Sequence, residues 1–187
     1  MKKVLLYSGG MDSWLISRLW NPDIKLFVNV GTKSCIEEMK RLPKDVIVED
    51  LSFLGKFEQK GENFFLPLRN LFLVEVASYY GDVICLGATG QSTHFDKNSI
   101  FAEKTESVVN YLYYENSNKK IQIVMPYLNK TKEQMFTEFV EKGGDLKEAF
   151  ESSFSCYSPI NGKECGVCNS CKRKIKAFEG VGFYVKK

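Results

Sequence analysis

The chain has 187 residues, 44% of them hydrophobic, which suits one domain with a full core and excludes two large independent domains. A formal net charge of +3 is too small to indicate a nucleic-acid-binding protein by itself. No run of about 18 apolar residues occurs, so no membrane span is predicted, and the first apolar stretch is too short for a signal peptide. We therefore expect a cytoplasmic protein.

Short apolar runs alternate along the chain with segments of helical hydrophobic spacing. Strands are predicted at residues 4–7, 24–30, 45–49, 82–87 and 121–125. Helices are predicted between Asp12 and Asn21 and at residues 69–80, 104–114 and 132–142, and residues 37–41 are predicted to belong to a further helix that Pro43 ends. Strands that alternate with helices at this spacing indicate a parallel sheet covered on both faces. We therefore predict an α/β fold with a three-layer, Rossmann-like arrangement.

The first strand and the first helix are joined by residues 8–13, Ser-Gly-Gly-Met-Asp-Ser. Ligands of open parallel sheets bind beyond the carboxyl ends of the strands, and a helix N-terminus offers unpaired N–H groups to an anion. Two glycines let a phosphate approach the backbone, Ser8 and Ser13 add hydroxyl donors, and Asp12 can hold Mg²⁺. The spacing is neither that of a Walker loop nor that of the dinucleotide fingerprint. The alternative is a turn that only links strand to helix.

This segment resembles the pyrophosphate loop (PP-loop) of the ATP-pyrophosphatase superfamily, whose signature is S-G-G-x-D-S. The resemblance implies a sheet of the adenine nucleotide alpha hydrolase type. It also implies cleavage of ATP between its α and β phosphates, which leaves an adenylated substrate. The residues that it assigns to ATP are Ser8, Gly9, Gly10, Met11, Asp12 and Ser13.

Four of the six cysteines lie close together, at Cys156, Cys165, Cys168 and Cys171. Four thiolates around one tetrahedral ion form a closed structural zinc site, so we predict bound Zn²⁺. An iron–sulfur cluster is the main alternative, because C-x2-C-x2-C also opens the bacterial ferredoxin pattern, although no further cysteine follows here. We therefore divide the chain into an ATP-binding α/β domain, residues 1–150, and a zinc-binding segment packed on it, residues 151–187.

Segments along nearly the whole chain resemble the 7-cyano-7-deazaguanine synthase (QueC) family of queuosine biosynthesis. They are the loop at 8–13, Leu-Pro-Leu-Arg-Asn at 66–70, Leu-Gly-Ala at 86–88, residues 126–133, and Ser-Cys-Tyr at 155–157 with the cysteine cluster. The resemblance implies a carbon–nitrogen ligase that makes 7-cyano-7-deazaguanine from 7-carboxy-7-deazaguanine and ammonia. An adenylated carboxylate and an adenylated amide would be its intermediates. It also implies a homodimer.

The same resemblance implies roles for individual residues. Asp12, Ser13 and Lys132 are expected to be catalytic, with Lys132 neutralising the charge that grows on pyrophosphate. Arg69 and Gly87 are expected to contact the nucleotide. The residues expected in the deazapurine pocket are His94, Phe95 and Asp96. The chain departs from the family in this last loop and is shorter between residues 50 and 63.

Three alternatives remain open. The enzyme could stop at the amide or adenylate another carboxylate. Sulfur transfer to tRNA, which other PP-loop enzymes perform, needs a reactive or cluster-bound cysteine, and neither Cys35 nor Cys85 resembles one. A zinc-ribbon nucleic-acid binder would explain the basic run at residues 172–176 but not the loop at 8–13. We therefore expect neither nucleic acid nor a membrane as a partner.

Overall fold

The structure, a computed structural model, describes residues 1–59, 65–90, 95–115, 117–156 and 159–184. Within these residues, parallel strands form one five-stranded sheet in the order β3-β2-β1-β4-β5. The strands are β1 (Lys3–Leu6), β2 (Ile24–Asn29), β3 (Val46–Asp50), β4 (Val83–Cys85) and β5 (Gln122–Val124). The predicted parallel α/β sheet is confirmed.

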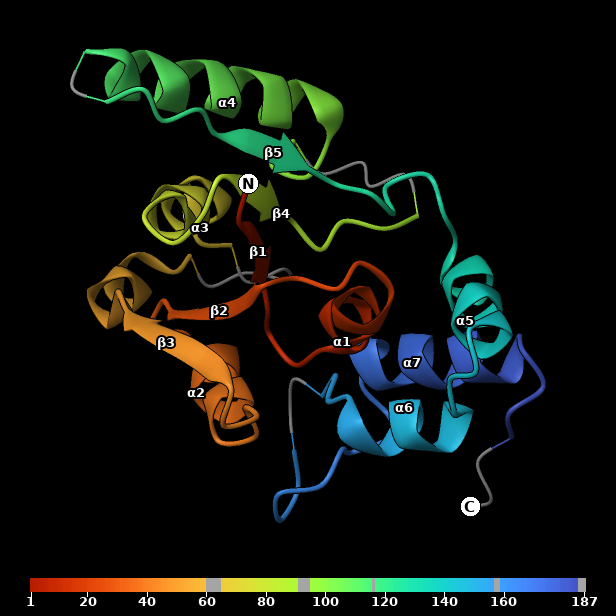
Figure 1. The fold of residues 1–187 in the computed structure, drawn as a ribbon. Helices are drawn as coiled ribbons and strands as arrows, with labels where there is room; N and C mark the ends of the chain where they lie inside the picture. Colours follow the sequence, from red (N-terminus) through yellow and green to blue (C-terminus); the bar gives the residue numbers. More distant parts are fainter. Residues whose placement is uncertain (60–64, 91–94, 116, 157–158, 185–187) are drawn as a thin grey trace.

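Helices cover both faces of this sheet (Figure 1). One face carries α3 (Arg69–Ser78) and α4 (Ser99–Tyr114), and the other carries α1 (Met11–Leu19) and α2 (Lys33–Met39). Three further helices are α5 (Lys132–Glu141), α6 (Leu146–Ser152) and α7 (Asn169–Glu179). Both α5 and α6 pack against α1, and α7 packs against α5. The predicted three-layer arrangement is therefore confirmed.

The strand order reverses beside β1, the central strand. The chain runs from β1 outward to β2 and β3, and then returns to the other side of β1 to form β4 and β5. The loops that follow β1 and β4 therefore leave the same edge of the sheet and diverge from each other, which opens a ligand-binding position between them. Residues 8–13 and residues 86–90 lie at this position.

The hydrophobic core extends from the sheet into the C-terminal helices. Trp14 of α1 and Phe139 of α5 pack edge to face, with ring centroids 5.4 Å apart. Phe136 of α5 and Phe178 of α7 are both fully buried, with centroids 4.3 Å apart. Residues on both sides of position 150 thus share one apolar core.

Several helices begin at capping side chains that hydrophobic spacing did not reveal. Thr32 accepts a bond from the N–H of Cys35 (3.3 Å), so α2 begins at Lys33 and ends at Met39; it contains the first part of the stretch 37–41 that was predicted to be helical. Asn98 accepts from the N–H of Phe101 (2.9 Å), so α4 begins before residue 104. Helix α5 begins as predicted, at a capping box formed by Thr131. A 3₁₀ helix, η1 (Ser52–Phe57), and helices α6 and α7 had not been predicted.

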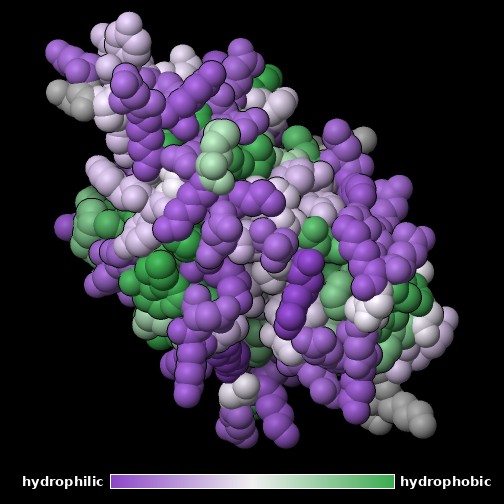
Figure 2. Space-filling model, viewed as in Figure 1, coloured by the Kyte–Doolittle hydropathy of each residue, from purple (hydrophilic) through white to green (hydrophobic). Residues whose placement is uncertain are grey.

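The face shown in Figure 2 is mainly hydrophilic, with a hydrophobic patch over β3. This strand is at the edge of the sheet, and its residues Ile47 and Val48 are 37% and 45% exposed. An exposed apolar edge is a surface on which another chain can pack. None of the helices in the described part of the chain has the length and apolar character needed to cross a bilayer.

Candidate functional site

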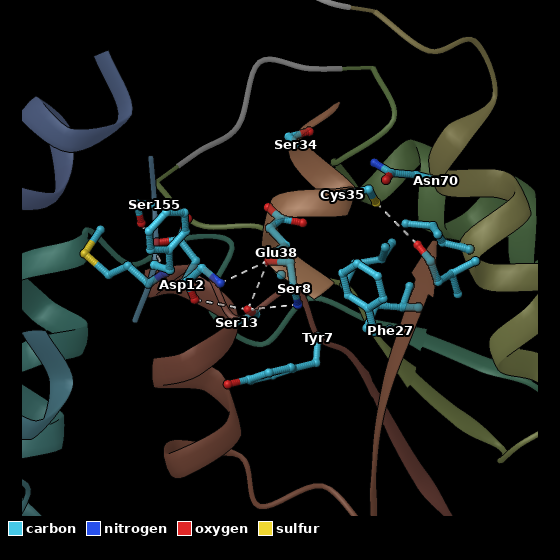
Figure 3. A pocket seen from close by; sticks show the side chains of 18 of the residues that line it. Tyr7, Ser8, Asp12, Ser13, Phe27, Ser34, Cys35, Glu38, Asn70 and Ser155 are labelled. Atoms are coloured by element: carbon cyan, nitrogen blue, oxygen red, sulfur yellow. Dashed lines mark hydrogen bonds between the residues drawn. The ribbon is translucent and has the colours of Figure 1, made fainter. Parts of the chain in front are cut away.

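Two serines hold the loop between β1 and α1 in a tight turn (Figure 3). The Ser13 hydroxyl accepts a bond from the N–H of Ser8 (3.2 Å) and donates to the carbonyl of Gly10 (3.1 Å). The Ser8 hydroxyl accepts from the N–H of Gly10 (3.2 Å). Gly9 has a φ of +74°, which a side chain would strain. The turn leads directly into α1, whose N-terminus provides the positive end of a helix dipole.

A cavity of about 400 Å³ opens over this loop. Its walls come from the loops after β1, β2 and β4, from α2, α3 and α5, and from residues 154–173. The residues that the sequence assigned to ATP or catalysis and that line the cavity are Ser8, Gly10, Met11, Asp12, Ser13, Arg69, Gly87 and Lys132. The fold therefore brings these residues from distant parts of the chain to one place. Their roles remain predictions.

Asp12 and Lys132 form an ion pair between the first turns of α1 and α5, with Nζ bonded to Oδ1. Their side chains are 32% and 27% exposed, so the pair stands at the cavity wall and not in the core. The hydroxyl of Thr89, in the loop after β4, donates to the other carboxylate oxygen (3.5 Å). A carboxylate beside a lysine suits a metal–polyphosphate ligand, because the carboxylate can bind Mg²⁺ and the ammonium can pair with phosphate.

The opposite wall is built by the start of α3 and the loop before α4. Asn70 donates from Nδ2 to the carbonyl oxygen (3.0 Å) and a carboxylate oxygen (2.9 Å) of Asp96. Asp96 itself does not line the cavity, but it accepts hydrogen bonds from Asn70, which does. Phe95 is 94% exposed and is not among the lining residues, and His94 lies outside the described residues. The assignment of these three residues to the substrate remains a prediction.

The four clustered cysteines form a compact group whose sulfur atoms all lie within 4.8 Å of one another. Tetrahedral Zn–S bonds of about 2.3 Å would place the sulfurs about 3.8 Å apart, so a small contraction suffices to bind the ion. Backbone N–H groups of Cys165, Cys168 and Cys171 donate to cluster sulfurs at 3.3 to 3.5 Å. All six cysteines lie in the described residues, and none forms a disulfide. The donor set therefore fits zinc.

Comparison with known proteins shows the family to which this chain belongs. The family described as "Queuosine biosynthesis protein QueC" matches residues 19–182. This chain belongs to the QueC family.

Curated relatives extend the match to the loop at residues 8–13. The chain is 28% identical to the 7-cyano-7-deazaguanine synthase of Chlorobaculum parvum, with 97% of this chain and 93% of the relative aligned. It is 27% identical to 7-cyano-7-deazaguanine synthase 1 of Desulfitobacterium hafniense (95% and 91% aligned). It is 24% identical to the enzyme of that name from Methanothermobacter thermautotrophicus (97% and 96% aligned). The similarity thus covers nearly the whole of each protein.

The cavity of this QueC-family chain also contains polar residues to which no role in the site had been assigned from the sequence. They are Thr32, Ser34, Glu38, Asn70, Lys97, Ser155, Ser170 and Arg173. Burial lowers the pKa of Lys97, and nearby Arg69 lowers it further, while Asp96 and Asp12 act in the opposite direction. Glu38 lies above Ser8 in Figure 3, so the lining includes an acidic group as well as basic ones. Their positions in the sequence do not show that they share one cavity, because they meet only when the sheet has formed.

Burial raises the pKa of Glu38 to about 7, although Arg69 lowers it. In the folded state Glu38 keeps a proton that the unfolded chain releases at its ordinary, lower pKa. The folded state therefore loses stability as the pH rises from that value to about 7. Glu38→Gln removes this loss, and we expect it to stabilise the protein at pH 8 by about 1 kcal/mol, because cavity water screens the group. Thermal unfolding should show a smaller gain at pH 5 than at pH 8.

Glu37→Gln is the matched control for this measurement. In the wild-type protein, the hydrogen bond that Glu37 accepts from Lys40 lowers the pKa of Glu37, and Arg41 lowers it to a smaller extent. A lowered carboxyl pKa contributes stability above the unfolded value, so this neighbouring substitution should not stabilise the protein at pH 8. If both variants gained the same stability at both pH values, the effect would not come from the titration of Glu38.

Proposed function

We propose that this chain is an ATP-dependent ligase that converts 7-carboxy-7-deazaguanine and ammonia into 7-cyano-7-deazaguanine. The observation that supports it is the meeting of the loop at residues 8–13, the Asp12–Lys132 pair and Arg69 around one cavity in a QueC-family chain. A polyphosphate needs N–H donors, a metal-binding carboxylate and cations at one place. This cavity contains all of these groups.

Adenylation solves the chemical difficulty of the proposed reaction. A free carboxylate does not react with ammonia, because oxide would be the leaving group, whereas AMP leaves readily. The amide then needs a second adenylation before loss of AMP yields the nitrile. In this proposal the loop N–H groups and the hydroxyls of Ser8 and Ser13 bind the terminal phosphates of ATP. Lys132 stabilises the negative charge that develops on pyrophosphate as the bond to the α-phosphorus breaks.

Two metal ions belong to the proposal. Asp12 would hold Mg²⁺, which when bound offsets the charge of the phosphate oxygens. The cysteines Cys156, Cys165, Cys168 and Cys171 would hold Zn²⁺. Four thiolates fill every position of a tetrahedral ion and leave none for a substrate, so this zinc would stabilise structure and would not take part in the reaction.

The proposal is tested by incubating the purified protein with 7-carboxy-7-deazaguanine, ammonium and Mg·ATP and following all products by mass spectrometry. We expect the nitrile, with one AMP and one pyrophosphate released for each activation. Accumulation of the amide alone would support the alternative in which the enzyme catalyses only the first conversion and stops at the amide. Release of ADP in place of AMP would overturn the proposed chemistry.

Lys132→Gln is expected to lower kcat by about 10²-fold with a smaller change in KM for ATP. The reason is that a donor aimed at developing charge contributes mainly in the transition state. Lys130→Gln is the matched control, because Lys130 precedes the same helix but pairs with Glu138 (2.6 Å) and does not line the cavity. Steady-state kinetics of AMP release measure both. A Lys132→Gln enzyme with normal kcat would exclude Lys132 from this role.

We also propose that the protein is a homodimer in the cytoplasm. The exposed apolar residues Ile47 and Val48 on the edge strand β3 are consistent with a chain-to-chain contact. Light scattering coupled to size-exclusion chromatography measures the oligomeric state directly, and a monomer at all concentrations would refute the dimer.

A further inference from the structure

The chain just before the first cysteine ligand lies against the loop at residues 8–13. The N–H of Phe154 donates to the carbonyl of Gly9 (2.9 Å). The N–H of Met11 donates to the hydroxyl oxygen of Ser155 (3.4 Å). Figure 3 shows Ser155 on the same side of the cavity as Asp12. The residue after Ser155 is Cys156 of the cysteine cluster, so the residues that bond to the loop lie directly beside the cluster.

The Ser155 hydroxyl is placed where a phosphate would bind. Met11 is the first residue of α1, and its N–H has no acceptor within the helix. A serine hydroxyl can accept one hydrogen bond and donate another. Its oxygen accepts from Met11, and within the described residues no group accepts its hydrogen. Because Ser155 lines the cavity, this hydrogen can be donated to an anion bound there.

An ion pair between the part-exposed Glu164 and the buried Lys174 contacts the backbone of Ser155. The N–H of Ser155 donates to one carboxylate oxygen of Glu164 (2.6 Å), and Nζ of Lys174 donates to the other (2.9 Å). Lys174 is only 1% exposed, and its ammonium also donates to the carbonyl oxygens of Phe150 (2.8 Å) and Ser153. A charge so completely buried requires partners of this kind. Lys174 thereby fixes the chain on both sides of Phe154.

Both members of this pair belong to the cysteine-rich segment. Glu164 precedes the ligand Cys165, and Lys174 lies one helical turn after the ligand Cys171 on α7. From the other side, the Arg41 guanidinium covers the ring of Phe154 at 3.8 Å and donates to the carbonyl of Gly162 (3.0 Å). Any loosening of the cysteine cluster would therefore move the segment that contacts residues 9–11.

We propose that Ser155 is a further phosphate-binding residue and that Lys174 and Glu164 position it, so that zinc and ATP bind cooperatively. The inference rests on the proposed ATP site. Bound zinc would hold Cys156 and Cys165 together, and with them Ser155 and Glu164, the residues that directly precede these two cysteines. Binding linkage is reciprocal, so a zinc ion that strengthens ATP binding is itself held more tightly when ATP is bound.

The first test is equilibrium competition for zinc between the protein and a chromophoric chelator, with and without Mg²⁺ and a non-hydrolysable ATP analogue. We expect the analogue to raise the zinc affinity of the wild-type protein by at least about fivefold, the low end of measured couplings. Ser155→Ala should keep its zinc, lose most of this increase, and bind the analogue about tenfold more weakly, because a hydrogen bond to a charged group is lost. Ser152→Ala, which changes an exposed serine at the end of α6, is the matched control.

The second test separates positioning from folding. Lys174→Met alone leaves the part-buried Glu164 without its cation and can unfold the segment, so the informative variant combines Glu164→Gln with Lys174→Met and removes both charges. Lys176→Met, which changes an exposed lysine of the same helix, is the matched control. We expect the double variant to retain zinc, with KM for ATP raised about tenfold and kcat changed less. A double variant with bound zinc and wild-type KM would overturn the positioning role.

The outcomes distinguish this inference from the proposed function. If the wild-type protein bound no ATP analogue at all, the ATP site itself would be wrong. If it bound the analogue while its zinc affinity stayed the same, and Ser155→Ala bound it equally well, only the coupling proposed here would be refuted.

Discussion

Asp12→Ala is expected to abolish the release of AMP and pyrophosphate while the fold and the zinc content remain intact. Asp12 is a carboxylate of the loop that lines the cavity, and it pairs with Lys132. Its removal eliminates the proposed Mg²⁺ ligand and leaves Lys132 without its partner. A loss of about 4 kcal/mol of transition-state stabilisation, a usual size for a metal that offsets phosphate charge, lowers the rate roughly 10³-fold.

The fold should tolerate this change, because the side chain is 32% exposed and its ion pair lies at the cavity wall. Asp45→Ala is the matched control, since Asp45 also pairs with a lysine, Lys25, but does not line the cavity. Circular dichroism and zinc analysis of both variants should match the wild type, and only Asp12→Ala should be inactive. Undiminished AMP release by a folded Asp12→Ala protein would place the ATP chemistry elsewhere.

Cys168→Ser is expected to remove bound zinc and to destabilise the protein strongly. Cys168 is the N-cap residue of α7 and accepts a bond from the N–H of Cys171, so it both ligates the predicted ion and starts the helix. Helix α7 contributes the buried Phe178 to the shared core. A loss of about 4 kcal/mol would lower Tm by roughly 10 °C in a chain of this length. Thermal unfolding and metal analysis measure the two effects.

Cys85→Ala is the control for zinc content, because Cys85 is buried in β4 outside the cluster. We expect it to keep one zinc per chain even if it loses some stability through the cavity that it creates. The same analysis addresses the iron–sulfur alternative, which would appear as iron and visible absorption in the wild-type protein. Retention of stoichiometric zinc by Cys168→Ser would show that the ion is bound by other residues.

Local patterns were sufficient to predict much of this molecule. Residues 8–13 were recognised because a strand, two glycines and a helix start follow one another within a few residues, and the structure shows that turn between β1 and α1. The cysteine cluster was recognised because three of its four cysteines lie within one short stretch, at Cys165, Cys168 and Cys171. In both cases the signal is contained in neighbouring positions, so it does not depend on how the rest of the chain folds.

Other features could not be predicted in the same way. The starts of α2 and α4 depend on hydrogen bonds that the side chains of Thr32 and Asn98 accept, and hydrophobic spacing does not detect such bonds. The bond between Met11 and Ser155 joins residues 144 positions apart, and no pattern in either segment points to the other. The raised pKa of Glu38 likewise depends on burial that exists only in the folded chain.

The amino-acid sequence by itself therefore determined the alternation of strands and helices, the turn at residues 8–13 and the cysteine cluster, because each is encoded by spacing over a few residues. Only the tertiary structure decided what surrounds that turn. The return of the chain to the other side of β1 brings the loop after β4 beside it, where Thr89 donates to Asp12, and the C-terminal segment brings Ser155 to the N–H of Met11. Contacts of this kind arise from packing between distant segments, and packing is a property of the whole fold.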